Sequence, residues 1–165
     1  MTYSILPIAE EHIEGFRAAV DVVARERKYL SFLEAQSLEA MTAFVRNNIE
    51  RGHPQFVAVS DGRVIGWADV IPNYNRPIYR HSGTFGLGVV PEFRDKGIGK
   101  TLTRRAIDAA FEFGLTRIDL SLRESNVTAF ALYKKFGFEI EGLHRNAVCI
   151  EGHYENKISM ALLKG

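Results

Sequence analysis

The sequence lacks several features that would assign a protein to a class at once. It holds one cysteine, Cys149, in 165 residues, which excludes an internal disulfide framework and favours a reducing compartment. It has no apolar run near the roughly 20 residues of a membrane-spanning helix, and its first residues lack the basic and apolar regions of a signal peptide. We therefore expect a cytoplasmic protein with no membrane partner.

An excess of charge of one sign is also missing. The 21 Lys and Arg residues balance 20 Asp and Glu residues, leaving a formal net charge of +1. There is no basic face with interleaved aromatic residues, so no nucleic-acid partner is expected. The five histidines show no metal-ligand spacing, so no metal site is expected either. Without repeats or linkers, and with 46% hydrophobic residues, the chain is predicted to form a single domain over residues 1–165.

Apolar periodicity predicts alternating helices and strands. Helices are expected over 10–28, 37–50, 97–113 and 126–136, and strands over 3–7, 55–60, 63–71, 84–90, 117–122, 138–150 and 154–163. Ser37 is placed to cap the second helix, whose apolar face would comprise Leu38, Met41, Phe44, Val45 and Ile49. Asp61-Gly62 predicts a tight hairpin. The order of elements indicates an α/β domain.

The most informative segment runs from Val89 to Thr101, where a strand leads through a charged, glycine-rich loop into a helix. Such a junction presents free backbone N–H groups to an anion. A nucleoside-triphosphate loop is excluded because Arg94 stands where that motif needs glycine, and a dinucleotide fingerprint is excluded because its third glycine is missing. The remaining pattern, Arg94-x-x-Gly97-x-Gly99, is by itself also compatible with a simple turn.

A second segment follows the next strand. Asn126 and Tyr133 are seven residues apart, about two helical turns, so they lie along one face of a helix. Asn126 can cap that helix or offer its amide to a ligand. Tyr133 is either a phenol that faces a ligand or an aromatic core residue among neighbouring phenylalanines.

Together the two segments resemble the GNAT N-acetyltransferase superfamily. Residues 94–99 resemble its loop for the acetyl-CoA pyrophosphate, and Asn126-x-x-Ala129-x-x-x-Tyr133-x-x-x-Gly137-Phe138 resembles its later cofactor and catalytic segment. The element order is similar to the GNAT acyl-CoA N-acyltransferase fold, a central mixed sheet of about seven strands with helices on both faces. The tail, which contains Gly152-x-Tyr154-Glu155, resembles small-molecule acetyltransferases of the amino-acid and phosphinothricin type.

The resemblance implies acetyl-CoA as the donor, with its pantetheine arm along a bulged, splayed strand. The implied cofactor-binding residues are Leu87, Gly88, Val89, Arg94, Asp95, Lys96, Gly97, Ile98, Gly99, Lys100 and Asn126. Gly86 and Gly88 have the alternative role of relieving packing. Tyr133 matches the general acid that protonates the departing thiolate. Tyr79, His81 and Tyr154 are candidate acceptor-binding residues.

The resemblance leaves the general base unassigned. Some members carry a glutamate on the strand before Asn126, and the matching residue is Ser121, which cannot take that role without a base of its own. A water chain, Glu124, His81, Asp69 or bulk solvent could accept the proton instead. None of these alternatives has strong support in the sequence.

The sequence thus predicts an enzyme that transfers the acetyl group of acetyl-CoA to a primary amine of a small molecule, an amino acid or an analogue. The amine would attack directly in a ternary complex, since Cys149 is expected to be a buried core thiol rather than a nucleophile. Two alternatives stay open: a protein N-terminal or lysine acetyltransferase, and a non-catalytic acyl-CoA-binding regulator. Dimers are common among the proteins that it resembles, so a homodimer is also left open.

Overall fold

The computed structural model describes all 165 residues, and its elements follow the predicted order. The helices are α1 (Ile13–Arg25), α2 (Leu38–Arg51), α3 (Ile98–Phe113) and α4 (Val127–Lys135). The strands are β1 (Ser4–Pro7), β2 (Gln55–Ser60), β3 (Arg63–Pro72), β4 (Ser82–Val89), β5 (Arg117–Arg123), β6 (Glu139–Ile150) and β7 (His153–Leu163). None of the helices has both the length and the apolar character needed to cross a bilayer.

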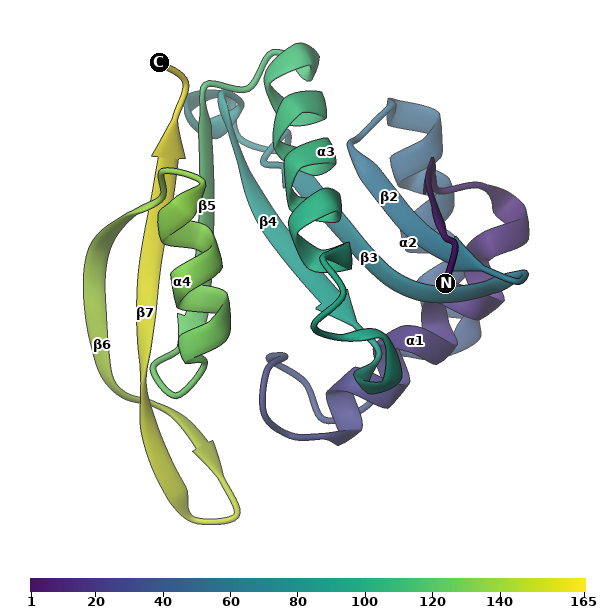
Figure 1. Cartoon of the computed structure of the whole chain (residues 1–165). Helices are drawn as coiled ribbons and strands as arrows, with labels where there is room; N and C mark the ends of the chain where they lie inside the picture. The colour runs from purple at the N-terminus through teal and green to yellow at the C-terminus, as the bar shows by residue number, and fades with distance from the viewer.

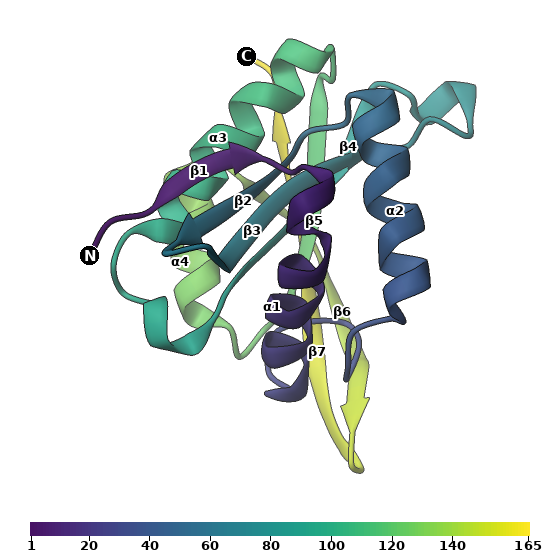
Figure 2. The ribbon, with the colours of Figure 1, turned by 90° about the vertical axis from the view of Figure 1, so that its right-hand side faces the viewer.

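The seven strands form one sheet in the order β1-β2-β3-β4-β5-β7-β6. All neighbours are antiparallel except β4 and β5, which are parallel, so the predicted mixed sheet is confirmed. Helices α3 and α4 lie on one face of the sheet, and α1 and α2 lie on the other (Figures 1 and 2). We call these the α3/α4 face and the α1/α2 face.

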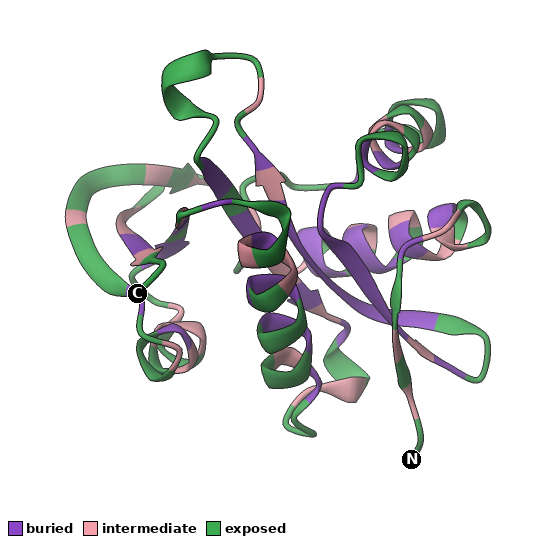
Figure 3. Ribbon diagram, turned by 90° about the horizontal axis from the view of Figure 1, so that it is seen from above, coloured by how far each residue is buried: buried purple, intermediate pink, exposed green.

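The core lies around the middle of the sheet. Strands β2 and β3 are buried along nearly their whole length, because helices cover both of their faces (Figure 3). Strand β6 forms an edge and is mostly exposed, and its hairpin with β7 projects beyond the helices (Figure 1). Cys149 lies near the end of β6 and is exposed, so the prediction of a buried core thiol is wrong. Alternation along the strand predicted burial, but no helix covers this end.

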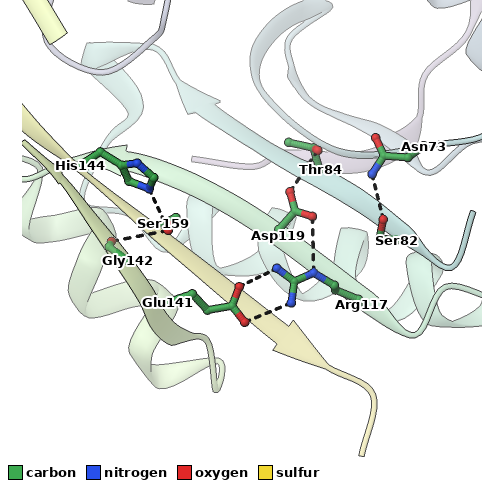
Figure 4. Close-up of polar contacts among 9 residues, drawn as sticks. All are labelled: Asn73, Ser82, Thr84, Arg117, Asp119, Glu141, Gly142, His144 and Ser159. Carbon is green, nitrogen blue, oxygen red and sulfur yellow. Dashed lines mark hydrogen bonds and ion pairs between the residues drawn. The ribbon is translucent and has the colours of Figure 1, made fainter. Parts of the chain in front are cut away.

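The feature that creates the site is the divergence of β4 and β5. The two strands pair only between Ser82–Thr84 and Arg117–Asp119, although both continue further. Two polar contacts lie at the paired end of β4 and β5. The Thr84 hydroxyl on β4 donates to Asp119 on β5 at 3.2 Å, and Arg117 on β5 forms an ion pair with Glu141 on β6 at 2.6 Å (Figure 4). The last pair is Thr84 with Asp119, and the remaining parts of β4 and β5 diverge (Figure 1).

The β3–β4 ladder contains no bulge. Its register runs without a shift from Gly66 opposite Val89 to Pro72 opposite Gly83. The expectation of a bulged β4 is therefore wrong, whereas the expectation of a splayed one is right. The backbone groups that β4 offers are left unpaired because β5 turns away, not because an extra residue interrupts the ladder.

Candidate active site

A cavity of about 730 Å³ lies where β4 and β5 diverge. Its walls include Phe85, Leu87, Leu120, Asn126 and Tyr133, and, from the other side, Phe16, Trp67 and Asp69. The loop between α1 and α2, residues 29–33, and the end of the β6–β7 hairpin, residues 147–150, complete the lining.

The two groups of wall residues belong to opposite faces of the sheet. Directly opposed residues of an antiparallel pair point to the same face. The ring of Trp67 packs edge-on against Phe16 of α1, with the ring centroids 5.9 Å apart, so Trp67 lies on the α1/α2 face. Asp69 lies on the same face, because it is two residues further along the strand. Phe85 stacks edge-on against Tyr133 of α4 at 5.6 Å, which places it on the α3/α4 face. The cavity therefore passes through the sheet at the splay.

Strand β4 turns one set of backbone groups toward this splay. Val90 donates its N–H to Ile65 and Asn73 donates to Ser82, at 2.9 and 3.0 Å. Because hydrogen-bonded pairs alternate in an antiparallel ladder, the even-numbered residues of β4 bond to β3. The N–H and C=O groups of Phe85 and Leu87 consequently point toward β5, beyond the last β4–β5 pair.

Gly88 is one of the even-numbered residues, so its backbone does not face the splay. Its backbone bonds to β3, and a Cβ there would lie 2.1 Å from Cη2 of Trp67. The absence of a side chain at Gly88 is therefore required by packing of the indole. Its predicted contact with the donor stays a prediction.

The glycine-rich loop forms an open cradle for an anion. Gly97 has φ 81° and precedes α3, whose first intrahelical bond joins Thr101 N–H to the Gly97 carbonyl at 3.1 Å. The N–H groups of Ile98, Gly99 and Lys100 therefore have no helical partner. A Cβ on Gly97 would meet nothing within 4 Å, and one on Gly99 only two side chains at 3.9 Å. This cradle fits the pyrophosphate of acetyl-CoA. Ile98 contributes only its amide, because its side chain is buried in the core.

Arg94, the charged residue expected to hold the pyrophosphate, is already engaged. Its Nε donates to the Val89 carbonyl at 2.9 Å, its two terminal nitrogens bond both carboxylate oxygens of Glu26, and it stacks on Tyr29. The ion pair and hydrogen bonds with Glu26 raise the pKa of Arg94. Arg94 therefore fastens the loop to the end of α1, and its contact with a phosphate stays a prediction. Lys96 and Lys100 have no ion-pair partner, and Asp95 adopts φ 62° in the turn.

Helix α4 brings Asn126 and Tyr133 to the cavity. The Asn126 side-chain oxygen accepts from Ala129 N–H at 3.3 Å, so the predicted cap is present, and its NH₂ group is left for another partner. Tyr133 is 8% exposed, and its ring packs between Phe85 and Phe138. Its hydroxyl has no hydrogen bond in the chain and is still not sealed from solvent, so it faces the cavity. Burial raises the pKa of the phenol, which keeps it protonated as an acid must be.

The residues expected to bind the acceptor lie elsewhere. Tyr79 lines a smaller hollow with Tyr74 and Arg76, and neither His81 nor Tyr154 lines the main cavity. Glu124, a candidate base, is bonded to Asn156 outside the cavity. Ser121 does line the cavity.

The acidic side chain that does line the cavity is Asp69. It is joined to a buried chain of polar groups: Gln55 Nε2 donates to Asp69 Oδ2 at 3.2 Å, Asn48 Nδ2 donates to Gln55 Oε1 at 3.0 Å, and Asn48 Oδ1 meets Nδ1 of His53 at 3.0 Å. All four residues are between 1% and 8% exposed. Desolvation raises the pKa of Asp69 to about 7, against the opposing effect of the Gln55 hydrogen bond.

One feature of the sequence, the position of Asn48 in α2, indicates this buried chain of polar groups. On α2 the buried residues are Met41, Val45 and Asn48, whereas Leu38 and Ile49 are exposed, so the predicted face was centred on the wrong stripe. The spacing of Met41, Val45 and Asn48 follows the helical period. A polar residue in an apolar stripe indicates a buried hydrogen-bond partner. That partner, Gln55, is supplied by another element.

The sheet is mixed and splayed, a cavity passes through it at the splay, and an anion cradle lies at one side of that cavity. These features together define an acyl-CoA N-acyltransferase fold. Residues 20–138 match the model of the Acetyltransferase (GNAT) family. The chain is 33% identical over 114 residues to an L-amino acid N-acetyltransferase of Escherichia coli K12, covering 68% of this chain and 70% of the relative. It is 28% identical over 119 residues to the ribosomal protein bS18-alanine N-acetyltransferase of that strain, covering 72% and 76%.

Among solved structures, a phosphinothricin acetyltransferase of Sinorhizobium meliloti in complex with acetyl-CoA has the same fold. Its TM-score is 0.91 at 22% identity, covering 100% of this chain and 90% of that one. The chain belongs to the GNAT family of acetyltransferases, in which acetyl-CoA is the acetyl donor.

Proposed function

We propose that this enzyme acetylates the primary amine of a small molecule that also carries a carboxylate, by direct attack in a ternary complex. The observation that carries the proposal is a single cavity lined by Phe85, Leu87, Asn126 and the Tyr133 phenol on one face of the sheet and by the Asp69 carboxylate on the other. Both substrates can meet in such a cavity without a covalent enzyme intermediate. The exposed Cys149 at its edge makes no hydrogen bond to a base that would activate it as a nucleophile.

The acceptor end of the cavity is bounded by a segment of the chain, which favours a small acceptor over a protein. The loop between α1 and α2 lines this end, and Arg123 holds it: the guanidinium donates to the carbonyls of Arg27 and Leu30 at 2.6 and 2.7 Å. Arg123 is almost fully buried, so the two bonds are formed out of water, where they are strong. A peptide would need an open groove at the place where this loop lies.

Lys157 provides a positive charge that can bind the carboxylate of the acceptor. It stands opposite Arg123 in the β5–β7 ladder, so both point to the α1/α2 face. Lys157 lines the cavity, and its ammonium has no ion-pair or hydrogen-bond partner in the chain. Asp69 is of opposite charge and lies on the same face. An amino acid, with an ammonium and a carboxylate, complements this pair.

The donor side is assigned to groups on the other face. The N–H groups at the start of α3 hold the pyrophosphate, and the backbone of Phe85 and Leu87 together with the Asn126 amide directs the pantetheine arm toward the splay. Acetyl-CoA supplies an activated acyl group with a thiolate leaving group. Tyr133 gives that sulfur its proton.

An amine panel tests the proposal. Purified enzyme and acetyl-CoA are mixed with single L-amino acids, the same compounds without their carboxylate, and peptides with free N-termini, and thiol release is followed. Turnover greatest with a free amino acid is expected. Preference for peptides would favour a protein acetyltransferase. Acetyl-CoA binding by calorimetry without turnover of any amine would favour a regulator, and would contradict the proposal.

A further inference from the structure

We propose that Asp69 is the proton acceptor for the attacking amine and that the buried Gln55–Asn48–His53 chain holds its carboxylate in place. This assignment rests on the proposed acetylation of a small amine. It fills the role left vacant by Ser121, from a different strand and on the acceptor face.

The first reason is position. Asp69 stands opposite Gly86 in the β3–β4 ladder, and a Cβ on Gly86 would lie 3.1 Å from Asp69 Oδ1. The carboxylate therefore lies against Gly86, between Phe85 and Leu87, the residues of β4 whose backbone groups are unpaired. Oδ1 has no partner in the chain and is not sealed from solvent, so it is open to the cavity, while Oδ2 is taken by Gln55. Tyr133 approaches the same cavity from the opposite face.

The second reason is the direction of the hydrogen bonds. Gln55 uses its NH₂ group toward Asp69 and its oxygen toward Asn48, and Asn48 in turn uses its oxygen toward His53. His53 must then donate from Nδ1, so each donor in the chain points toward the carboxylate. Burial, with a smaller effect of Arg51, lowers the pKa of His53, which keeps the ring neutral while it donates. Rings of Tyr74 and Phe113 pack against it and fix its orientation.

The third reason is the electrostatic setting. The surroundings of Asp69 are mostly uncharged: Phe16 and Val20 from α1, Met41 and Phe44 from α2 and Gly86 from β4 line the same cavity, and Gln55 from β2 donates to the carboxylate. The charged or titratable side chains elsewhere in the cavity wall are Tyr29, Arg123, Tyr133, Cys149 and Lys157. Desolvation dominates, and a carboxyl with a pKa of about 7 is a far better base than an ordinary aspartate.

The proton balance is complete with these groups. Asp69 takes one proton from the bound ammonium, which frees the nitrogen lone pair to form the C–N bond as the C–S bond breaks. Tyr133 supplies the proton that the sulfur requires. The second proton lost by the nitrogen restores the Tyr133 phenol through solvent, and Asp69 releases its own proton to solvent.

The test compares Asp69→Asn with the wild-type enzyme and with Asp108→Asn, a matched change at an exposed ion pair on α3. We expect kcat to fall by about 100-fold or more, in line with the loss of a general base, with acetyl-CoA affinity unchanged by calorimetry. In the wild type, kcat/KM should rise with pH around pH 7 as Asp69 loses its proton, and this limb of the pH profile should be absent in the variant. The defect should shrink across the panel as the pKa of the acceptor amine falls, because such amines arrive unprotonated.

The unfolding temperature, measured at two pH values, separates a role of Asp69 as proton acceptor from a purely structural role. An aspartate whose pKa is raised in the folded state loses stability as pH rises through that value, so Asp69→Asn should unfold at a higher temperature than wild type at pH 8 and not at pH 4. A second variant, Gln55→Met, keeps Asp69 but removes its donor. It should move the kcat/KM limb to higher pH and keep the plateau within a few-fold.

Full activity of Asp69→Asn with the pH limb intact would overturn the assignment of Asp69 alone. A lower unfolding temperature at pH 8, with activity reduced only in proportion to folded protein, would do the same. Absence of wild-type turnover with every amine would instead overturn the proposed function, and the role of Asp69 with it.

Discussion

The two faces of the sheet contribute to the cavity in different ways. The α3/α4 face offers mainly backbone: the unpaired groups of Phe85 and Leu87 lie at the cavity, the N–H groups at the start of α3 lie outside its lining, and Asn126 and Tyr133 are added from one helix. The α1/α2 face offers side chains from several separate elements, among them Asp69, Arg123 and Lys157, with Gln55 behind the Asp69 carboxylate.

This difference suits the two faces to different substrates, the donor on one face and the acceptor on the other. In the proposed function, backbone groups bind the acetyl donor, and their geometry survives most substitutions as long as the turn and splay are kept. Side chains on the α1/α2 face are proposed to set the charge and size of the acceptor, and each can change independently. Substitutions on the two faces should therefore have separable effects on donor and acceptor.

The largest expected effect tests the one side chain on the α3/α4 face that acts in the chemistry. Tyr133→Phe removes only a hydroxyl that has no bond within the chain and leaves the ring between Phe85 and Phe138. We expect turnover to fall by about 1,000-fold, in the range of general-acid loss, with little change in unfolding temperature or donor affinity. Tyr3→Phe is the control: it removes a phenol hydroxyl outside the cavity, which contacts the Thr101 hydroxyl at 3.3 Å. A rate within a few-fold of wild type would assign the proton to another donor.

The next effect concerns stability on the α1/α2 face. In Gly88→Ala the new Cβ would lie 2.1 Å from the Trp67 ring, which is itself packed against Phe16. We expect a loss of about 3 kcal/mol in the free energy of unfolding, typical of severe overpacking, measured by urea denaturation. If Gly88→Ala unfolds like wild type and only donor affinity falls, this glycine serves the ligand and the division between the faces is incorrect.

The sequence predicts the local structure of the α3/α4 face and misses most of the α1/α2 face for the same physical reason. The loop, the helix starts and the Asp61-Gly62 turn, with φ 48° and 76°, are local, so the pattern alone specifies them. The end of β4–β5 pairing depends on contacts between distant segments. So does the Arg94–Glu26 pair, which joins residues 68 positions apart. Asn48, Gln55 and Asp69 meet only after helix and strands have packed, and no spacing along the chain encodes that.

A smaller effect tests whether the cradle is built for the donor. Gly99 lies in the first turn of α3 without a positive φ, and a Cβ there would have no close contact. Gly99→Ala should therefore keep or slightly raise stability, since alanine restricts the unfolded chain. The added methyl lies at the cradle, so we expect the Kd for acetyl-CoA to rise by about tenfold, or 1.4 kcal/mol, in calorimetry. Unchanged affinity would mean that the anion lies elsewhere on the loop.

The smallest expected effect sharpens the acceptor side. Lys157→Met keeps the length of the side chain and removes the unpaired charge that faces the cavity. A partly solvated ion pair is worth about 1 kcal/mol, so KM for an amino acid should rise by about fivefold while kcat and donor affinity stay the same. The matched control is Lys164→Met, at the exposed end of the chain. For the same acceptor without its carboxylate, KM should not change. An equal rise for both acceptors would show that Lys157 shapes the cavity without reading charge, and the preference for a carboxylate would then have to come from another residue on the α1/α2 face.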